Sequence, residues 1–242
     1  QISEEGTAGE LLEQIRQEKQ KLVKEGKLKK FALSDSVIYK GDDNKYYEQV
    51  GKSDKEITEE IAFDLPNGWS WCRLKDICSI FTGATFKKEE TVTTKEGVRI
   101  LRGGNISPFE LRIKDDDIFL TKDKVKEDII LKENDILTPA VTSLENIGKM
   151  VRVNSDMPNT TVGGFVFIIR LYLKNQWLSK YILYLLSSPF MIDFMKSITN
   201  KSGQAFYNIG KERLSTALLP IPSLAEQHRI VAQIEKLFEQ LR

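Results

Sequence analysis

One loop holds the side chains best suited to recognising another molecule. The stretch NKSGQAFYNIG, residues 200–210, places Lys201, Gln204 and Asn208 among glycines. A lysine ammonium group can pair with a phosphate, and the side-chain amide of Gln or Asn matches the donor and acceptor on an adenine edge. The alternative is an ordinary loop whose amides cap neighbouring helices, and residue type alone favours that alternative.

The chain lacks the motifs of common catalytic and nucleotide-binding sites. No G-x-G-x-x-G, G-x-x-x-x-G-K-[ST] or G-x-S-x-G pattern occurs. The Asn-Pro-Pro-Tyr or Asn-Pro-Pro-Phe motif, with which amino-methyltransferases grip a flipped base, is also missing. The glycine pairs in RGGNIS (102–107) and VGGF (162–165) are better explained by turns or bulges. We therefore expect no catalytic residues in this chain.

Neither the cysteines nor the acidic residues predict a metal site. Cys72 and Cys78 are six residues apart, which is no metal-ligand spacing, and we expect two buried thiols in a reducing cytosol. The carboxylates of Asp115, Asp116 and Asp117 are consecutive, whereas a two-metal nuclease needs spaced ones. A solvated loop is the favoured interpretation of this run.

Charge is balanced over the whole chain but not along it. The 242 residues include 36 Lys and Arg and 35 Asp and Glu, so the net charge is +1. Residues 149–213 hold nine basic and three acidic residues, and residues 110–135 hold six basic and nine acidic ones. A basic sector of this kind can form one nucleic-acid face, although such fluctuations are common.

A helix with an apolar stripe is expected at each end of the chain. Residues 7–25 begin with a capping-box pattern, Thr7 and Glu10, and end before Gly26. The spacing of Ala8, Leu11, Ile15, Glu18 and Leu22 is that of a heptad seam with one polar interruption.

The last helix, from Ser223 onward, carries a longer stripe, formed by Leu224, Gln227, Val231, Ile234, Phe238 and Leu241 and widened by Ile230 and Leu237. Such a stripe must be buried, and the obvious partner is the helix at 7–25 in this chain or in another copy. Packing on the helix's own domain is the alternative.

The segment between these helices predicts an α+β fold with a mixed sheet. Residues 36–51 read as a hairpin and 52–64 as a charged linker. Residues 176–199 read as a helix that breaks near Pro189. Short apolar runs predict strands at 98–101, 117–120, 135–137, 149–153 and 164–171. No apolar run is long enough to span a membrane and no signal peptide is visible, so a cytoplasmic location is expected.

Taken together, several stretches resemble the specificity subunit of type I restriction–modification systems. The most specific are P-x-x-x-EQ-x-x-I at Pro222 to Ile230 and LLE-x-I-x-x-EK-x-x-L at Leu11 to Leu22. The resemblance covers essentially the whole chain, and it also includes FDLPNGWSWCRLKDI, GVRILRGGNIS and KSGQAFYNI.

The resemblance implies a function in DNA recognition without catalysis. In this family, globular target-recognition domains each read one half of a bipartite double-stranded DNA sequence, and two conserved helices form an antiparallel coiled coil between them. Modification subunits that dock on this scaffold methylate adenine with S-adenosylmethionine, and a restriction subunit cleaves DNA with ATP. The chain itself is expected to bind neither cofactor, and a bacterial or archaeal cytoplasm is implied.

The resemblance also implies a division of the chain. Residues 1–30 would be one conserved coiled-coil helix, 31–64 a hairpin and linker, 65–219 a target-recognition domain, and 220–242 the distal conserved helix. A complete subunit has two recognition domains, so this chain would be a C-terminal half or a natural half-subunit. A half could pair with itself through the end helices and read a two-fold symmetric target.

The expected site residues fall into three groups. Phosphate contacts are expected from Lys87, Lys88, Lys149, Arg152 and Lys201. Base contacts, or support for the loop beside them, are expected from Arg99, Arg102, Asn105, Gln204 and Asn208. The coiled-coil interface is expected to use Leu11, Ile15, Leu22, Leu224, Val231, Ile234, Phe238 and Leu241. A strand-edge salt bridge is the alternative for Arg99 and Arg102, and a structural role is the alternative for Asn105 and Gln204.

Two other functions remain open at this level. The chain could be a helical scaffold without DNA specificity, or a metal-dependent nuclease that uses the acidic run. DNA recognition with a coiled-coil spacer stays the leading hypothesis. A helix of about 20 residues spans about 30 Å, which is close to the 34 Å of one DNA turn.

Overall fold

The computed structural model describes residues 5–30, 34–202 and 206–241. The chain divides into two compact units. Unit 1 comprises residues 1–78, 172–181 and 215–242, and unit 2 comprises residues 79–171 and 182–214. The expected recognition domain, 65–219, contributes to both units, and its boundaries stay a prediction.

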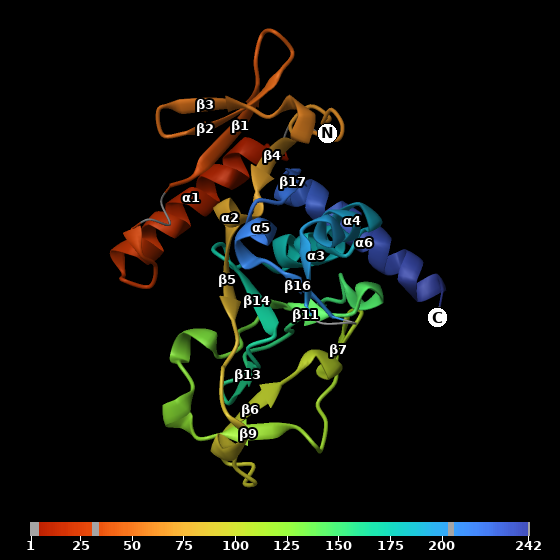
Figure 1. Cartoon of the computed structure of the whole chain (residues 1–242). Coiled ribbons are helices and arrows are strands. Elements are labelled where there is room, and N and C mark those ends of the chain that lie inside the picture. The colour runs from red at the N-terminus through yellow and green to blue at the C-terminus, as the bar shows by residue number, and fades with distance from the viewer. Residues whose placement is uncertain (1–4, 31–33, 203–205, 242) are drawn as a thin grey trace. The chain divides into compact units, whose positions relative to one another are not determined.

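Unit 1 combines two long helices with two small sheets (Figure 1). Its elements are α1 (Ala8–Lys24), β1 (Ser36–Lys40), β2 (Tyr46–Val50), β3 (Ser53–Glu56), β4 (Ser70–Arg73), α2 (Leu74–Ile77), the first half of α3 (Gln176–Leu186), β17 (Leu218–Ile221) and α6 (Leu224–Gln240). Strands β1, β2 and β3 form an antiparallel sheet in that order, and β4 pairs with β17.

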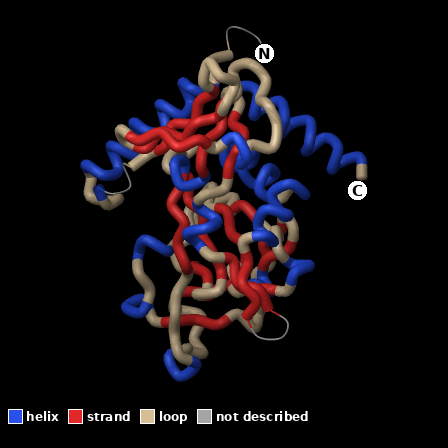
Figure 2. The backbone as a smooth tube through the Cα atoms, turned by 45° about the horizontal axis from the view of Figure 1, so that its top comes forward, coloured by secondary structure: helices blue, strands red, loops and turns tan. Residues whose placement is uncertain are grey.

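Unit 2 is built from short strands and helices, which Figure 2 distinguishes by colour. Its elements are β5 (Cys78–Thr82, from Ser79 on), β6 (Val98–Leu101), β7 (Ile106–Ser107), β8 (Glu110–Leu111), β9 (Ile118–Leu120), β10 (Ile136–Pro139), β11 (Val141–Thr142), β12 (Val151–Arg152), β13 (Thr160–Val162), β14 (Val166–Leu171), α4 (Pro189–Ser197), β15 (Thr199–Ser202), β16 (Phe206–Ile209) and α5 (Lys211–Ser215, to Leu214). The expected strands and the helix break at Pro189 are confirmed.

Three sheets form the body of unit 2. Their strand orders are β12-β10-β14-β5, β13-β6-β9 and β11-β16-β15. The β13–β6 pair is parallel, and the pairs β10–β14, β6–β9 and β15–β16 are antiparallel, so the expected mixed α+β character is confirmed. Side chains from β6, β10, β13 and β14 belong to one core, in which Ile100, Leu137, Val162 and Ile168 are completely buried.

Local sequence explains where α1 begins and ends. The Thr7 hydroxyl accepts a hydrogen bond from the Glu10 backbone N–H, and the Glu10 carboxylate accepts one from the Thr7 N–H, so the expected capping box is present. Gly26 has a φ of +71°, a conformation that glycine adopts without a steric cost and that ends the helix.

The segment expected as a linker contains regular structure. The predicted hairpin is confirmed as β1 and β2, with its turn at 41–44 and Asn44 at a φ of 63°. Residues 53–56 add the edge strand β3 to this hairpin, so the segment 52–64 is not only the charged linker that was expected. Periodicity could not reveal β3 because all four of its side chains are exposed and charged or polar.

A buried charge cluster joins the sheet of β1–β3 to β4. The Arg73 guanidinium donates hydrogen bonds to Glu48 on β2, to Glu60 and to the Thr216 carbonyl. The Arg73 side chain is only 8% exposed, so these acceptors replace the water that it has lost. One arginine therefore fixes three separate segments of unit 1 against one another.

The expected coiled coil between the end helices is not confirmed. Figures 1 and 2 show α1 and α6 extending in different directions within unit 1, and a Glu5–Arg229 ion pair lies near their N-terminal ends. Helix α1 buries Ala8, Leu11 and Ile15 within unit 1. The burial of these three residues of the apolar stripe is confirmed, but an apolar stripe does not identify the surface that covers it.

Helix α6 instead packs through its first half. Gln227 and Val231 are fully buried, the His228 ring lies 3.9 Å from that of Trp177, and Glu235 pairs with Lys180 at 2.7 Å. The exposed fraction of the apolar side chains rises along the helix, to 49% at Leu237 and 83% at Leu241. The last turns of α6 are thus largely uncovered in the described chain.

Both cysteines are buried and unpaired, as expected. Burial raises the pKa of both thiols, so they are protonated at neutral pH. Among the described residues, no helix combines the length and the apolar composition needed to cross a lipid bilayer.

Candidate nucleic-acid interface

Unit 2 contains a pocket whose wall is rich in lysine. Its volume is about 430 Å³, and part of its lining, called the floor below, is the end of β5 with the following turn, residues 80–85. The rest of its lining is Lys124, Lys126, Asp128, Ile129 and Lys211. Three ammonium groups against one carboxylate make this an anion-accepting concavity.

Two of these lysines have their charge available. Among the residues that the structure describes, no ion-pair partner is found for the ammonium groups of Lys126 and Lys211, and both residues are exposed. Lys124 pairs with Glu90 at 3.1 Å, which raises its pKa. Lys126 and Lys211 can therefore pair with a phosphate without first breaking an internal ion pair.

The floor of the pocket depends on a glycine. A Cβ atom at Gly83 would lie 2.0 Å from the Val162 carbonyl oxygen and 2.5 Å from that of Gly163. The close approach is held by hydrogen bonds from Gly83 N to Val166 O and from Ala84 N to Val162 O. Residues 83–84 thereby lie directly beside β13 and β14.

A glycine turn next to the floor presents an aromatic side chain. Residues 163–165 connect β13 to β14, and Gly163 bridges Ala84 in parallel register. The turn closes with Val166 N donating to Gly163 O, and Phe165 O accepts from Ala140 N. The Phe165 side chain is 73% exposed. The expectation of a turn at VGGF is confirmed.

The loop singled out in the sequence is a hairpin, not an irregular loop. Strands β15 and β16 pair with Asn200 opposite Asn208 and Lys201 opposite Tyr207. Directly paired residues point to the same side of a sheet and alternate along each strand, so Lys201 and Asn208 point to opposite sides. Gln204 lies outside the described residues.

This hairpin adjoins the aromatic turn through β11. Asn208 pairs with Val141, and Ile209 N donates to Ala140 O, while Ala140 N donates to Phe165 O. The structure thus brings Asn208 and the pocket residue Lys211 into the neighbourhood of residues 163–165, from positions far apart in the sequence.

Arg99 and Asn105 hold the acidic run in place. The Asp117 carboxylate accepts hydrogen bonds from the Arg99 guanidinium, the Asn105 amide and the Lys114 backbone N–H, at 2.9, 2.6 and 2.9 Å. Asn105 is 1% exposed. These are the structural alternatives considered for both residues, and their base contacts stay a prediction. Asp115 and Asp116 are exposed, as expected of a solvated loop, but that expectation is wrong for Asp117, which is buried.

The electrostatics of Asp117 follow from this geometry. Burial alone would raise the pKa of the Asp117 carboxyl, but the hydrogen bonds from Lys114, Asn105 and Arg99 outweigh burial and lower it. A lowered carboxyl pKa stabilises the fold above the pKa of the unfolded chain. This stabilisation is lost as the pH falls through the folded-state value.

We expect Asp117→Asn to lower the free energy of unfolding at pH 7 by about 2 kcal/mol, because Arg99 loses its charged acceptor. The variant should also lose less stability than the wild type when urea unfolding is repeated from pH 5 down to pH 3. Asp116→Asn, an exposed neighbour, is the control and should leave both properties unchanged. Identical acid profiles for the wild type and Asp117→Asn would contradict this assignment.

The other expected phosphate and base contacts are distributed over unit 2. Lys87 and Lys88 are exposed beside Glu90, and Lys149 is half-buried. Arg152 donates to Asn134 and Asn154, and Arg102 lies 3.6 Å from Asp116. None of these lines the lysine pocket. Their DNA contacts stay predictions.

The residues expected at a coiled-coil interface occupy different environments. Leu11, Ile15 and Val231 are buried. Leu22, Leu224 and Ile234 are half-buried, and Phe238 and Leu241 are exposed. Of these eight residues, Leu241 is the most exposed, at 83%.

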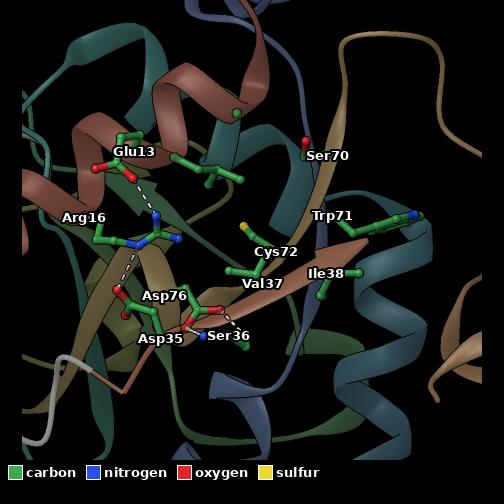
Figure 3. A pocket seen from close by; sticks show the side chains of 12 residues that line it. Glu13, Arg16, Asp35, Ser36, Val37, Ile38, Ser70, Trp71, Cys72 and Asp76 are labelled. Atoms are coloured by element: carbon green, nitrogen blue, oxygen red, sulfur yellow. Dashed lines mark hydrogen bonds and ion pairs between the residues drawn. The ribbon is translucent and has the colours of Figure 1, made fainter. Parts of the chain in front are cut away.

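A second pocket, of about 240 Å³ in unit 1, shows how α1 is fixed (Figure 3). Arg16 on α1 reaches Asp35 at 3.6 Å, and Ser36 donates to Asp76 through its hydroxyl and its backbone N–H. Burial raises the pKa of the Asp76 carboxyl. The same side of α1 buries Lys19, which pairs with Asp35 and lies over the Tyr172 ring. Polar contacts thus hold α1 within unit 1.

The lysine pocket and Phe165 were not predicted from the sequence. Lys124 and Lys126 lie in the segment with a negative charge balance, and Lys211 was counted only as one of nine scattered cations. Their convergence is a tertiary effect. Within the described ranges, no group of three His, Cys, Asp or Glu residues could hold a metal ion.

Comparisons with known proteins point in one direction. The family model described as "Type I restriction modification DNA specificity domain" matches residues 66–242. The chain is 30% identical over 250 residues to the type I restriction enzyme EcoAI specificity subunit of Escherichia coli, and 25% identical over 235 residues to the EcoEI specificity subunit of the same species. Each match covers 96% of this chain but only 36% of the relative.

Solved structures support the fold. The HsdS subunit from Thermoanaerobacter tengcongensis matches with a TM-score of 0.51 and 23% identity, over 74% of this chain and 39% of that one. A chain from the structure described as "Structural basis underlying complex assembly and conformational transition of the type I R-M system" matches with a TM-score of 0.54 and 23% identity, over 74% and 40% of the two chains.

Proposed function

Because the chain belongs to the type I restriction–modification DNA specificity family, we propose that it recognises a DNA sequence as a specificity subunit, or as half of one. The chain spans about a third of the length of the curated relatives. The lysine pocket of unit 2 carries the proposal, because three of its lining residues are lysines and one is an aspartate, in a chain whose net charge is only +1.

In this function, phosphates and bases are contacted by neighbouring elements of unit 2. Lys126 and Lys211 pair with backbone phosphates, which positions the duplex. The β15–β16 hairpin and the turn at 163–165 then face the grooves, where Asn208 can read an adenine edge. One such unit reads one half of a bipartite target.

Assembly and chemistry are assigned to other subunits. Modification subunits that use S-adenosylmethionine, and a restriction subunit that uses ATP, dock on the complete specificity subunit in a bacterial or archaeal cytoplasm. This chain binds neither cofactor. The expectation that it is not an enzyme agrees with the specificity subunits among its relatives.

The uncovered end of α6 supports docking of another chain there. Leu237, Phe238 and Leu241 are 49%, 37% and 83% exposed. A partner helix laid along this stripe would remove apolar area from water, at about 25 cal/mol per Å². The partner is a modification subunit, another specificity-subunit half or a second copy of this chain.

Selection from a random duplex library tests the function. The chain, alone and with modification subunits, should enrich one short sequence. The affinity for that sequence should fall with salt at a log–log slope of about −0.9 for each phosphate contact. Anisotropy titrations between about 50 and 200 mM salt measure this slope. A scaffold without DNA specificity would enrich no sequence, and a nuclease would cleave the library when a divalent cation is added.

A further inference from the structure

Phe165 is exposed in a way that folding does not explain. With 73% of its side chain open to solvent, it is the most exposed phenylalanine that the structure describes, ahead of Phe206 at 56% and Phe63 at 47%. A phenylalanine ring that stays in water does not gain the free energy that burial in an apolar core would contribute. A partner that covers the ring would recover this contribution.

The backbone beneath Phe165 is fixed from several directions. Gly163 N donates to Leu101 O, Val166 N donates to Gly163 O, and Ala140 N donates to Phe165 O. Gly164 is also confined, because a Cβ there would lie 2.9 Å from the Thr85 hydroxyl. The ring therefore projects from an ordered turn, and binding it costs little backbone entropy.

The surroundings of this turn are polar and basic. Leu101, whose carbonyl accepts from Gly163, precedes Arg102, whose side chain is 49% exposed and lies 3.6 Å from the exposed Asp116 carboxylate. Ala140, on the other side, connects the turn to β11 and β16, which carry Asn208 and lead to Lys211. Exposed aromatic rings among cations and amides are typical of surfaces that stack on nucleic-acid bases.

We propose that Phe165 acts as a wedge, inserting its ring at a base step of the bound duplex. The inference rests on the proposed function. The cations around the turn would hold the phosphates on both sides, and the ring would replace part of the stacking that the step loses. Because steps differ in the cost of unstacking, the wedge would add specificity at a position without hydrogen bonds to the base edges.

Base fluorescence and affinity test the wedge on the duplex recovered by selection. With 2-aminopurine placed at successive positions, the wild-type chain should raise the fluorescence at one step, because that step loses stacking. Phe165→Ala should abolish the rise and weaken binding roughly 5- to 100-fold, while the salt slope stays the same. Phe165→Trp should retain both signals.

Phe190→Ala is the matched control. Phe190 lies on α4 in unit 2 and is 42% exposed, so its loss removes a surface ring of the same type. This variant should keep the affinity and the fluorescence of the wild type. Circular dichroism spectra of all variants should coincide with that of the wild type.

Three results would overturn the wedge, and they differ in whether the proposed DNA recognition still holds. If the wild type binds its selected duplex and Phe165→Ala binds equally well with unchanged fluorescence, the wedge is wrong and DNA recognition stands. If Phe165→Ala weakens assembly with modification subunits but not DNA binding, Phe165 is a protein contact. If the wild type, with or without these subunits, prefers no duplex, the proposed function fails together with the wedge.

Discussion

Gly83→Ala is expected to destabilise unit 2 by about 3–5 kcal/mol, or to prevent its folding, because the added methyl group would meet backbone and not a movable side chain. The Cβ atom would lie 2.0 Å from the Val162 carbonyl oxygen, and the hydrogen bond from Ala84 N to the same oxygen prevents the strands from separating locally. Urea unfolding, followed by far-ultraviolet circular dichroism, measures the loss.

The control for this variant is Gly103→Ala in the same unit. A Cβ at Gly103 would meet only the Pro139 ring, at 3.7 Å, which is an ordinary contact distance. This variant should unfold within about 0.5–1 kcal/mol of the wild type. Equal unfolding midpoints for Gly83→Ala and Gly103→Ala would mean that β5 does not pack on β13 and β14 as described.

The second large effect is expected from charge reversal in the lysine pocket. The double variant Lys126→Glu/Lys211→Glu should bind the selected duplex roughly 100-fold more weakly at low salt, because two attractions become repulsions. The loss should shrink as salt screens the charges. Anisotropy titrations at several salt concentrations would show both changes, and the salt slope should become shallower by about 2.

Lys122→Glu/Lys196→Glu changes the net charge by the same amount at exposed positions of unit 2 that do not line the pocket. Its affinity should fall much less than that of the pocket variant. If the two double variants lose equal affinity, the net charge of the chain matters and the pocket has no particular role.

Local signals in the sequence were sufficient to predict most of the helices and strands. The capping box at Thr7 and Glu10, the break before Pro189 and the apolar runs at β6, β9, β10, β12 and β14 each depend on residues close in sequence. Capping, proline geometry and the local pattern of apolar residues can each be recognised without knowledge of the rest of the fold.

Partners across the fold could not be predicted in this way. The polar interruption of α1 was expected at Glu18, but the buried polar residue is Lys19, which is accommodated by Asp35 and Tyr172. Arg99 has the residue type of a base-reading group, yet it pairs with a buried carboxylate. In both cases the environment of a charge depends on a residue far away in the sequence.

The candidate interface also depends on contacts between residues that are far apart in the sequence. Lys124, Lys126 and Lys211 meet only because β5, the segment after β9 and the end of β16 come together. The exposure of Phe165 depends on hydrogen bonds to Leu101 and Ala140 through its turn. Residue type alone favoured a plain loop at 200–210. The pairing of β16 with β11 is what connects this hairpin to the candidate interface, and residue type could not predict that pairing.

The division of unit 1 into three stretches of chain has a consequence for synthesis on the ribosome. Strand β4 pairs with β17, and Trp69 donates a hydrogen bond to Glu226 at the start of α6, so both await residues that are made after unit 2. Unit 2 ends at residue 214 and has all of its strands before then. A nascent chain can therefore complete the lysine pocket before the residues after 214, which complete unit 1, have been made. Translation that stops near residue 214 would leave β4 without its partner β17, as an edge strand prone to aggregation.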